Sequence, residues 1–190
     1  MKDKNLVPIT SEEEFSKSIE NALLLADAKR ELELAKSPDL LADDLIVACQ
    51  NGDVSKVKSL LEVGVNPNAV RTFGTPLTCA MYSPNVLEIS HLLIDASADP
   101  NLQDQNGWSP LFCAAANDRA EVIRFLAESG ADINSQGSSD NRTALMNAAY
   151  FGHVNCVKTL LDLGADPEIK TTAGYRAIDF IKKKSLSAKK

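Results

Sequence analysis

The feature that most constrains the fold of this chain is a short pattern that recurs four times along it. Each copy has two mostly apolar positions, a two-residue spacer and then a glycine, which falls at Gly64, Gly130 and Gly164, with Ser97 at the same place in the second copy. The intervals between these positions are 33, 33 and 34 residues. The pattern is typical of a helix end with a left-handed cap, so Ser97 is expected to loosen its cap slightly. A period of this length predicts a stack of similar units that bury their apolar faces against one another.

A second motif recurs in step with the first, at intervals of 34 residues. It reads T-P-L-T-C-A at 75–80, S-P-L-F-C-A at 109–114 and T-A-L-M-N-A at 143–148. Thr and Ser are typical of a helix N-cap and Pro of the first turn, and the Leu and Ala are expected to face inward. The motif resembles the ankyrin T-P-L-H-x-A motif, whose period is ~33 residues, although the family's histidine is absent from all three copies. Gly152-His153-Val154 is similar to the family's turn between its two helices, and Gly52-Asp53-Val54 is its counterpart in the first unit.

The resemblance implies an all-α fold, an ankyrin-repeat solenoid of about four repeats plus a partial C-terminal cap over residues 38–183. An N-terminal helical extension over 1–37 and a Lys-rich tail over 184–190 are expected to flank it. The first unit lacks the Thr-Pro start, and Asp43 and Asp44 stand at that position. We expect these two carboxylates to be exposed cap residues of a terminal unit, one face of which meets water.

Two of the units contain one additional residue. In the second unit it lies within 82–85, so the loop between the two helices is expected to be longer. Ser83 is expected to be exposed there, and Pro84 is expected to end the first helix. In the fourth unit it lies within 135–141, so the turn there is expected to extend further.

Residues 1–37 do not match the repeat. Ser11-Glu12-Glu13-Glu14 is a capping-box pattern, and Phe15, Ile19 and Leu23 follow it at helical spacing. Two interpretations stay open: a helical extension that packs on the first repeat, or a separate helix that binds a partner.

Composition narrows the classes of partner. The formal net charge is −6 and the isoelectric point about 5.0, which argues against general binding to nucleic acid or to anionic membranes. Residues 1–10 contain no apolar run typical of a signal peptide, and no stretch approaches the ~20 apolar residues that a membrane span needs. We therefore expect a cytoplasmic protein without a membrane partner. The Lys-rich end is interpreted as a solvated tail, with nucleic-acid binding through it as a remote alternative.

No motif for catalysis, cofactor binding or metal binding is found. The chain has two histidines and no Gly-rich phosphate loop, G-x-S-x-G or H-E-x-x-H sequence. Cys49, Cys79, Cys113 and Cys156 are 30, 34 and 43 residues apart, a spacing that suits neither a zinc site nor a compact disulfide framework. We expect no enzyme, no metal and no cofactor, and cysteines that are buried as small apolar side chains.

The resemblance also implies where a partner protein binds, because ankyrin partners usually occupy the concave surface lined by the turns and the first helices. Aromatic residues make up only 5% of the chain, yet the repeat register places its one Trp and all three Tyr on that surface. Trp, Tyr and Arg dominate the binding energy of protein interfaces. The predicted partner-binding residues are Arg71, Phe73, Tyr82, Gln105, Asn106, Trp108, Asn117, Asp140, Arg142, Tyr150, Phe151 and Tyr175.

Acidic residues recur where each second helix returns to the next turn, and their sum predicts an acidic edge that favours a partner with a basic patch. The leading hypothesis is a protein-protein interaction module that binds and sequesters or inhibits its partner. The alternative is a bacterial or phage immunity-type or effector-type ankyrin protein that acts on a specific enzyme or toxin. The residues that form the acidic edge are Asp95, Asp99, Glu128, Asp132, Asp162 and Asp166.

Overall fold

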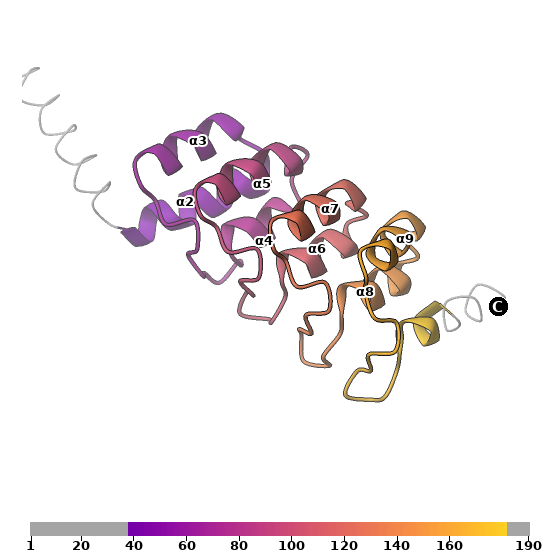
Figure 1. Cartoon of the computed structure of the whole chain (residues 1–190). Coiled ribbons are helices and arrows are strands. Elements are labelled where there is room, and N and C mark those ends of the chain that lie inside the picture. The colour runs from indigo at the N-terminus through magenta and orange to yellow at the C-terminus, as the bar shows by residue number, and fades with distance from the viewer. Residues whose placement is uncertain (1–37, 182–190) are drawn as a thin grey trace, which may run out of the picture. The chain divides into compact units, whose positions relative to one another are not determined.

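The computed structural model describes residues 38–181, and within this range the regular structure is helical (Figure 1). The expectations for residues 1–37 and for the Lys-rich tail lie outside the described residues. A last helix begins at 177 and is described as far as 181. The preceding helices are α2 (Pro38–Asn51), α3 (Val54–Glu62), α4 (Pro76–Ala80), α5 (Val86–Asp95), α6 (Pro110–Ala116), α7 (Ala120–Glu128), α8 (Ala144–Phe151) and α9 (Val154–Asp162).

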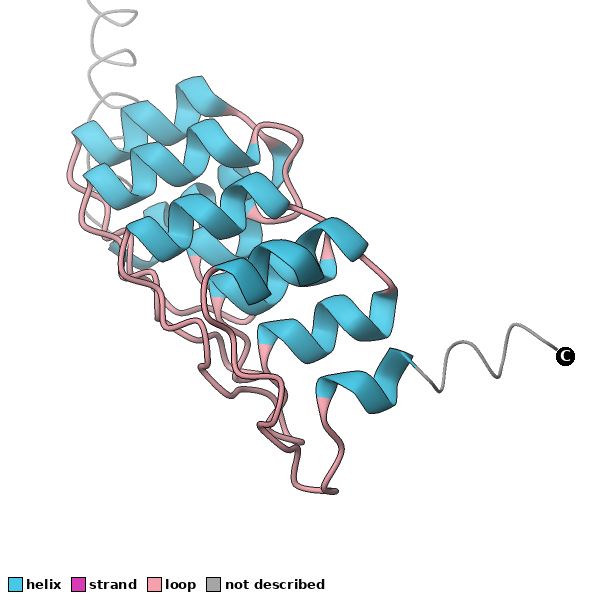
Figure 2. Cartoon of the chain, turned by 45° about the vertical axis from the view of Figure 1, so that its right-hand side comes forward, coloured by secondary structure: helices cyan, strands magenta, loops and turns pink. Residues whose placement is uncertain are grey.

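The helices lie in two rows. The first helices of the repeats, α2, α4, α6 and α8, form one row, and the second helices, α3, α5, α7 and α9, form the other (Figures 1 and 2). The turns between repeats all project on the same side, as the loops in Figure 2 show. The expectation of an all-α ankyrin solenoid is confirmed, because each repeat contributes one helix pair and one turn to the stack.

The second motif starts the first helices as its residues predict. A Thr or Ser side chain accepts a hydrogen bond from the backbone N–H three residues later, which satisfies one of the N–H groups that a helix start leaves without a partner. Proline occupies the first turn of α4 and α6. The bonds run from Thr78 N to Thr75 Oγ1 (3.1 Å), from Phe112 N to Ser109 Oγ (3.2 Å) and from Met146 N to Thr143 Oγ1 (3.3 Å).

The residue that closes each second helix has a left-handed backbone. Its φ is +85° at Gly64, +93° at Gly130 and +89° at Gly164, and +70° at Ser97. A side chain in this region costs roughly 1–2 kcal/mol. Ser97 therefore keeps the shape of the cap that the glycines form, at an energetic cost that the glycines avoid.

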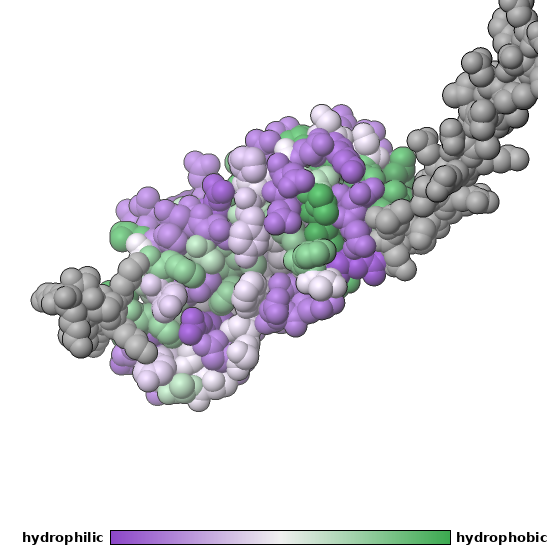
Figure 3. All heavy atoms as spheres, turned by 180° about the vertical axis from the view of Figure 1, so that it is seen from behind, coloured by the Kyte–Doolittle hydropathy of each residue, from purple (hydrophilic) through white to green (hydrophobic). Residues whose placement is uncertain are grey.

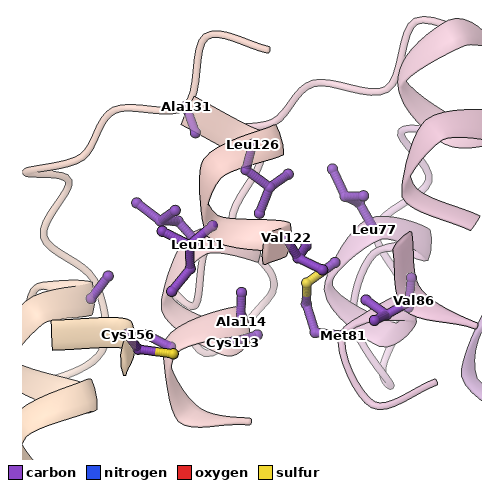
Figure 4. Close-up of a cluster of buried hydrophobic side chains, with 14 of the residues drawn as sticks. Leu77, Met81, Val86, Leu111, Cys113, Ala114, Val122, Leu126, Ala131 and Cys156 are labelled. Atoms are coloured by element: carbon purple, nitrogen blue, oxygen red, sulfur yellow. The ribbon is translucent and has the colours of Figure 1, made fainter. Parts of the chain in front are cut away.

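Apolar side chains fill the space between the two rows, as Figure 4 shows for Leu77, Met81 and Leu126. All four cysteines are buried and free, which confirms the expectation for them. Cys113 and Cys156 belong to this cluster, so their side chains act as small apolar groups.

Asparagine side chains join consecutive return loops. Asn101 donates from Nδ2 to the carbonyl oxygen of Gly130 (3.0 Å), and its Oδ1 accepts from the backbone N–H of Asp132 (2.7 Å). The Asp132 carboxylate in turn accepts from the N–H of Asn134 (2.9 Å). Asp132 therefore holds its own loop. Asn68 makes the same pair of bonds to the next loop, because its Nδ2 donates to Ser97 O and its Oδ1 accepts from Asp99 N. Asn134 Oδ1 accepts from Asp166 N.

Two details of the sequence prediction were wrong. Asp43 and Asp44 lie inside α2, which begins at Pro38, so they do not cap it. Ser83 was expected on the surface but is fully buried, because the longer loop before α5 turns it inward. There its hydroxyl accepts from Asn85 N (3.0 Å), and its carbonyl accepts from Arg119 Nη2 (3.2 Å) of the next repeat. The first helix does end before Pro84, as predicted.

The Gly-His turn before α9 contacts the backbone of the preceding repeat. His153 Nε2 lies 3.1 Å from the carbonyl oxygen of Ala116, at the end of α6. Its Nδ1 lies 3.8 Å from the Asp118 carboxylate. The imidazole therefore joins the third repeat to the fourth.

Candidate partner-binding surface

A groove of about 570 Å³ opens beside the first helices of the third and fourth repeats. We call it the aromatic groove. It brings together seven of the twelve residues predicted from the sequence, which come from the end of α4, the turns before α6 and α8, and the ends of α6 and α8. These seven are Tyr82, Trp108, Asn117, Asp140, Arg142, Tyr150 and Phe151.

Trp108 is held by the turn that precedes α6. The Asp104 carboxylate accepts hydrogen bonds from the backbone N–H groups of Asn106 (2.8 Å) and Trp108 (2.9 Å). The indole stacks on the ring of Phe112, with 6.1 Å between ring centroids and 23° between planes. Trp108 is 36% exposed, whereas Phe112 is 9% exposed, so a buried ring supports a ring that faces solvent.

The end of α8 supplies a second group of rings. Tyr150 and Phe151 meet edge to face with centroids 5.1 Å apart, and they are 48% and 44% exposed. The Arg142 guanidinium lies over the Tyr150 ring at 5.3 Å and over the Phe180 ring at 5.0 Å. These cation–π contacts place Arg142 between the fourth repeat and the last helix.

Tyr82 and Cys113 both line the groove. Burial, and after it the neighbouring Cys113 thiol, raise the pKa of Tyr82 to about 12. Burial, with the negative charge of Asp104 as a smaller cause, raises the pKa of Cys113 to about 12. Both groups are therefore neutral at physiological pH, and Cys113 is a poor nucleophile.

Polar groups that line the groove make hydrogen bonds within the chain. Asp140 accepts from Ser138 Oγ (2.7 Å) and pairs with Arg142 Nε (2.6 Å). Desolvation opposes ionisation of Asp140, but the Ser138 hydrogen bond and the Arg142 charge outweigh it and hold the pKa of that carboxyl below its usual range. Asn117 donates from Nδ2 to Cys113 O (2.8 Å), and Asn147 donates from Nδ2 to Phe112 O (3.3 Å).

The turns of the third and fourth repeats touch at the groove's edge. Ser138 N donates to Gly107 O (2.9 Å), and a Cβ on Gly137 would lie only 2.0 Å from that same oxygen. Only a residue without a side chain fits at 137. This close approach fixes the position of the turn that carries Asp140 and Arg142 relative to Trp108.

Five predicted residues lie outside the aromatic groove. Phe73 is 75% exposed in the turn before α4. Arg71 Nε lies 3.5 Å from the Asp43 carboxylate, and Gln105 and Asn106 are exposed in the turn before α6. Tyr175 lines a neighbouring cavity of about 140 Å³ that also includes Asp140, Arg142 and Phe180.

The prediction from the sequence missed three residues that line the groove or the neighbouring cavity, namely Phe112, Asn147 and Phe180. The first two lie within α6 and α8 and are buried, at 9% and 4% exposed, yet both also line the groove. One signal was available for Phe112, because it stands where the family motif has histidine. Phe180 belongs to the last helix, for which the sequence gives no complete repeat to align.

A second hollow, of about 900 Å³, lies against the row of second helices. Charged side chains of both signs line it, among them Glu88, Arg124 and Lys158, and its lining has no aromatic residue. The aromatic groove is the better candidate although it is smaller, because large rings contribute most to binding energy. Seen from the side opposite to Figure 1, apolar residues lie in separate patches among polar ones (Figure 3).

Two further features concern only residues 38–181. No group of three or more His, Cys, Asp or Glu side chains in this range is arranged to hold a metal ion. None of the helices described there combines the length and the apolar character that crossing a membrane requires.

Comparison with known proteins places the repeats in one family. A family profile described as ankyrin repeats (3 copies) matches residues 45–137 and 83–171. Similar proteins include the ankyrin repeat protein YahD of Escherichia coli strain K12, 33% identical over 122 residues, which are 64% of this chain and 60% of that protein. The fowlpox virus ankyrin repeat protein FPV014 is 32% identical over 127 residues, 66% of this chain and 29% of that protein.

A further similarity is to the palmitoyltransferase AKR1 of Lachancea kluyveri, 30% identical over 148 residues, which are 78% of this chain and 16% of that protein. The chain thus spans less than two thirds of each of these three relatives. Ankyrin repeats are in general protein–protein interaction modules. The profile covers more than half of the chain, and its matches coincide with the helix pairs and turns described above, so the chain belongs to the ankyrin-repeat family.

Proposed function

We propose that this protein binds a partner protein at the aromatic groove and sequesters or inhibits that partner by covering part of its surface. The observation that carries the proposal is the position of Trp108, the one tryptophan of the chain, which is 36% exposed at the groove. Tyr82, Tyr150 and Phe151 line the same groove and are 44–49% exposed. Rings of this kind are the usual centre of a protein interface.

The local structure supports binding without large rearrangement. Trp108 is fixed by the Asp104 hydrogen bonds and by its stack on Phe112, and the turn of the fourth repeat is fixed by its contact with Gly107. A surface already held in its binding shape loses little conformational entropy when a partner arrives. Occlusion then needs no catalytic group, only a covered surface on the partner.

The acidic edge indicates a second property of the proposed partner. Asp95, Glu128 and Asp162 are exposed at the ends of α5, α7 and α9, and none of these helices has a basic residue in its last turn. A row of carboxylates at three helix ends favours a partner with a basic patch, and such charges act mainly on the rate of association. Binding at the groove is expected to set the affinity.

The experiment first identifies the partner by capture with the full chain from the native cell, and then measures affinity with the purified partner. Trp108→Ala is compared with the unsubstituted protein. Two control variants remove exposed side chains from the row of second helices: Leu161→Ala, an apolar truncation, and Lys158→Ala, at the larger polar hollow. The proposal predicts that only Trp108→Ala lowers the affinity. A loss of affinity for Lys158→Ala with none for Trp108→Ala would move the site to the polar hollow.

A further inference from the structure

The two ends of the row of second helices differ in the side chains that they present to solvent. One position of these helices is buried in α5, α7 and α9, where a repeat precedes the helix. In α3 it holds the exposed Lys56, and the exposed Ser59 follows three residues later. Polar side chains therefore face outward where the row begins, as the solvent-facing end of a repeat array requires. The buried residues at this position are Ile89, Val122 and Cys156.

The other end of the row, α9, presents apolar side chains instead (Figure 1). Leu161 is 45% exposed, and Val157 is partly exposed although its counterparts in the three preceding repeats are fully buried. Within residues 38–181 no further second helix follows α9, so these positions lack the neighbour that covers them in the other repeats. The counterparts of Val157 are Val57, Ser90 and Ile123.

The last helix, 177–181, extends this apolar surface. Ile178 is 42% exposed and Ile181 is 44% exposed, whereas the same two positions are at most 2% exposed in each of the four earlier repeats. By the repeat register, both isoleucines face the place where a second helix of their own unit would lie against α9. We call Val157, Leu161, Ile178 and Ile181 the end face, and none of the four lines the aromatic groove. The buried counterparts of the isoleucines are Leu45, Leu77, Leu111 and Leu145, and Ala48, Ala80, Ala114 and Ala148.

The interfaces inside the stack show which kind of element covers such a face. Each second helix packs on the one before it, as α7 does on α5. The apolar residues of α7 on that side have the spacing i, i+3 and i+4, at Val122, Phe125 and Leu126. The Phe125 ring meets the ring of His91 in α5, with centroids 4.0 Å apart. An amphipathic helix with this spacing would continue the same interface at the end face.

Two other occupants fit the end face poorly. The start of the row in a second copy would bring Lys56 against Leu161, and a charge that is buried without a partner is costly. Residues 182–190 contain one large apolar residue, Leu186, so they do not supply apolar side chains at i, i+3 and i+4. A helix of another protein is the better occupant.

The charge around the end face is positive. Three lysines at 182–184 follow Ile181 directly, so their Cα atoms stay within about 11 Å of the Cα of Ile181. These lysines favour a helix with acidic residues, and they would repel one another if two end faces met. The charges of α9 and of residues 171–181 cancel, because they are those of Lys158 and Asp162, and of Arg176 and Asp179.

We propose that the end face binds an amphipathic helix of a partner protein, with apolar residues at i, i+3 and i+4 and acidic residues at its ends. The end face is a second docking surface, and its role does not depend on the function proposed for the aromatic groove.

The test titrates the full chain, labelled with ¹⁵N, with a synthetic acidic helix. This peptide has the sequence of residues 120–128 with two glutamates added at each end. Arg124→Lys and a lactam from that lysine to Glu128 keep it helical, at two positions that are exposed in α7. One comparison peptide carries lysines in place of the four added glutamates, and another has its apolar residues in scrambled order.

The backbone amide signals of Leu161 and Ile181 are expected to move along a saturating curve as the acidic helix is added. The expected Kd is about 1 mM or below, at least about fivefold tighter than for either comparison peptide at about 20 mM salt. The advantage over the lysine peptide should shrink as salt is added, because screening weakens the attraction to the three lysines.

Variants separate the contact from the fold. Leu161→Gln is expected to weaken binding of the acidic helix at least about fivefold, because it removes apolar area from the end face. Leu87→Gln, which changes an exposed leucine of α5, is the matched control and is expected to leave the titration unchanged, as is Trp108→Ala. Circular dichroism confirms that each variant is folded, and the peptide comparison in the unsubstituted chain does not depend on any variant.

The proposal is overturned if a comparison peptide binds as tightly as the acidic helix, or if the acidic helix leaves the signals of Leu161 and Ile181 unmoved at about 5 mM. It is also overturned if sedimentation shows that the chain is a dimer which Leu161→Gln dissociates, because a second copy then covers the end face. The function proposed for the aromatic groove is tested separately, since it depends on the partner affinity of Trp108→Ala and not on this titration.

Discussion

The indole of Trp108 stacks on Phe112, a residue that stands where the ankyrin motif has histidine, with the ring centroids 6.1 Å apart. Substituting Phe112 by leucine keeps a large apolar side chain in the first turn of α6 but removes the ring under the indole. We expect the free energy of unfolding to fall by about 1 kcal/mol and the Trp108 fluorescence to shift to longer wavelength. Denaturant titration followed by that fluorescence measures both. An unchanged emission spectrum would show that Phe112 does not set the environment of the indole.

The asparagine contacts between return loops predict a stability effect far from the groove. Asn101→Ala removes one donor and one acceptor that join the second return loop to the third, so the free energy of unfolding should fall by about 1–2 kcal/mol. Asn106→Ala, which removes an exposed amide in the next turn, should change it by no more than about 0.5 kcal/mol. Equal effects of the two substitutions would mean that the Asn101 bonds contribute nothing measurable.

Ser97 offers a test of backbone strain. It adopts φ +70° where the other repeats have glycine, so Ser97→Gly should stabilise the protein by about 0.5 kcal/mol, after the greater chain entropy of glycine in the unfolded state is subtracted. Ser129 precedes the corresponding Gly130, has a φ of −83° and donates its hydroxyl to Phe125 O. Ser129→Gly should therefore destabilise. Thermal melting of both variants tests whether the two substitutions change the stability in opposite directions.

The cysteines should resist thiol reagents in the native protein. Burial is the main cause that raises the pKa of Cys79 to about 11 and that of Cys156 to about 12, so little thiolate exists at pH 7.5. Labelling by a disulfide reagent should be far slower than in denaturant, and its rate should follow unfolding. Rapid labelling of one or more thiols under native conditions would contradict the buried positions.

Much of the fold could be predicted because helix starts and ends depend on local chemistry. The N-cap bonds of Thr75 and Thr143, and the left-handed backbone at Ser97, follow from residues within a few positions of each other. Ser83 could not be placed in this way. Its burial depends on Pro84, which lies over Gly52 of the first repeat, and on Arg119 of the third, and both contacts join residues more than thirty positions apart.

Part of the groove could also be predicted from the sequence. The repeat register placed Trp108 and Tyr150 on one surface, because their positions relative to the motif decide the face they occupy. It could not show that Asn147, buried in α8, turns an amide toward α6 and also lines the groove. Nor could it separate Phe73 from the other aromatic residues, since the groove depends on how the third and fourth turns meet at Gly107.

The most direct test of the aromatic groove as the binding surface is the affinity of the purified partner for Trp108→Ala, measured together with the melting temperature of the variant. If the partner binds there, Trp108→Ala should lower the binding free energy by about 2 kcal/mol or more, roughly thirtyfold in Kd, while the variant stays folded. Leu161→Ala should bind the partner as the unsubstituted protein does. If the folded Trp108→Ala protein binds its partner with unchanged affinity, the aromatic groove is not the binding surface and the central claim is wrong.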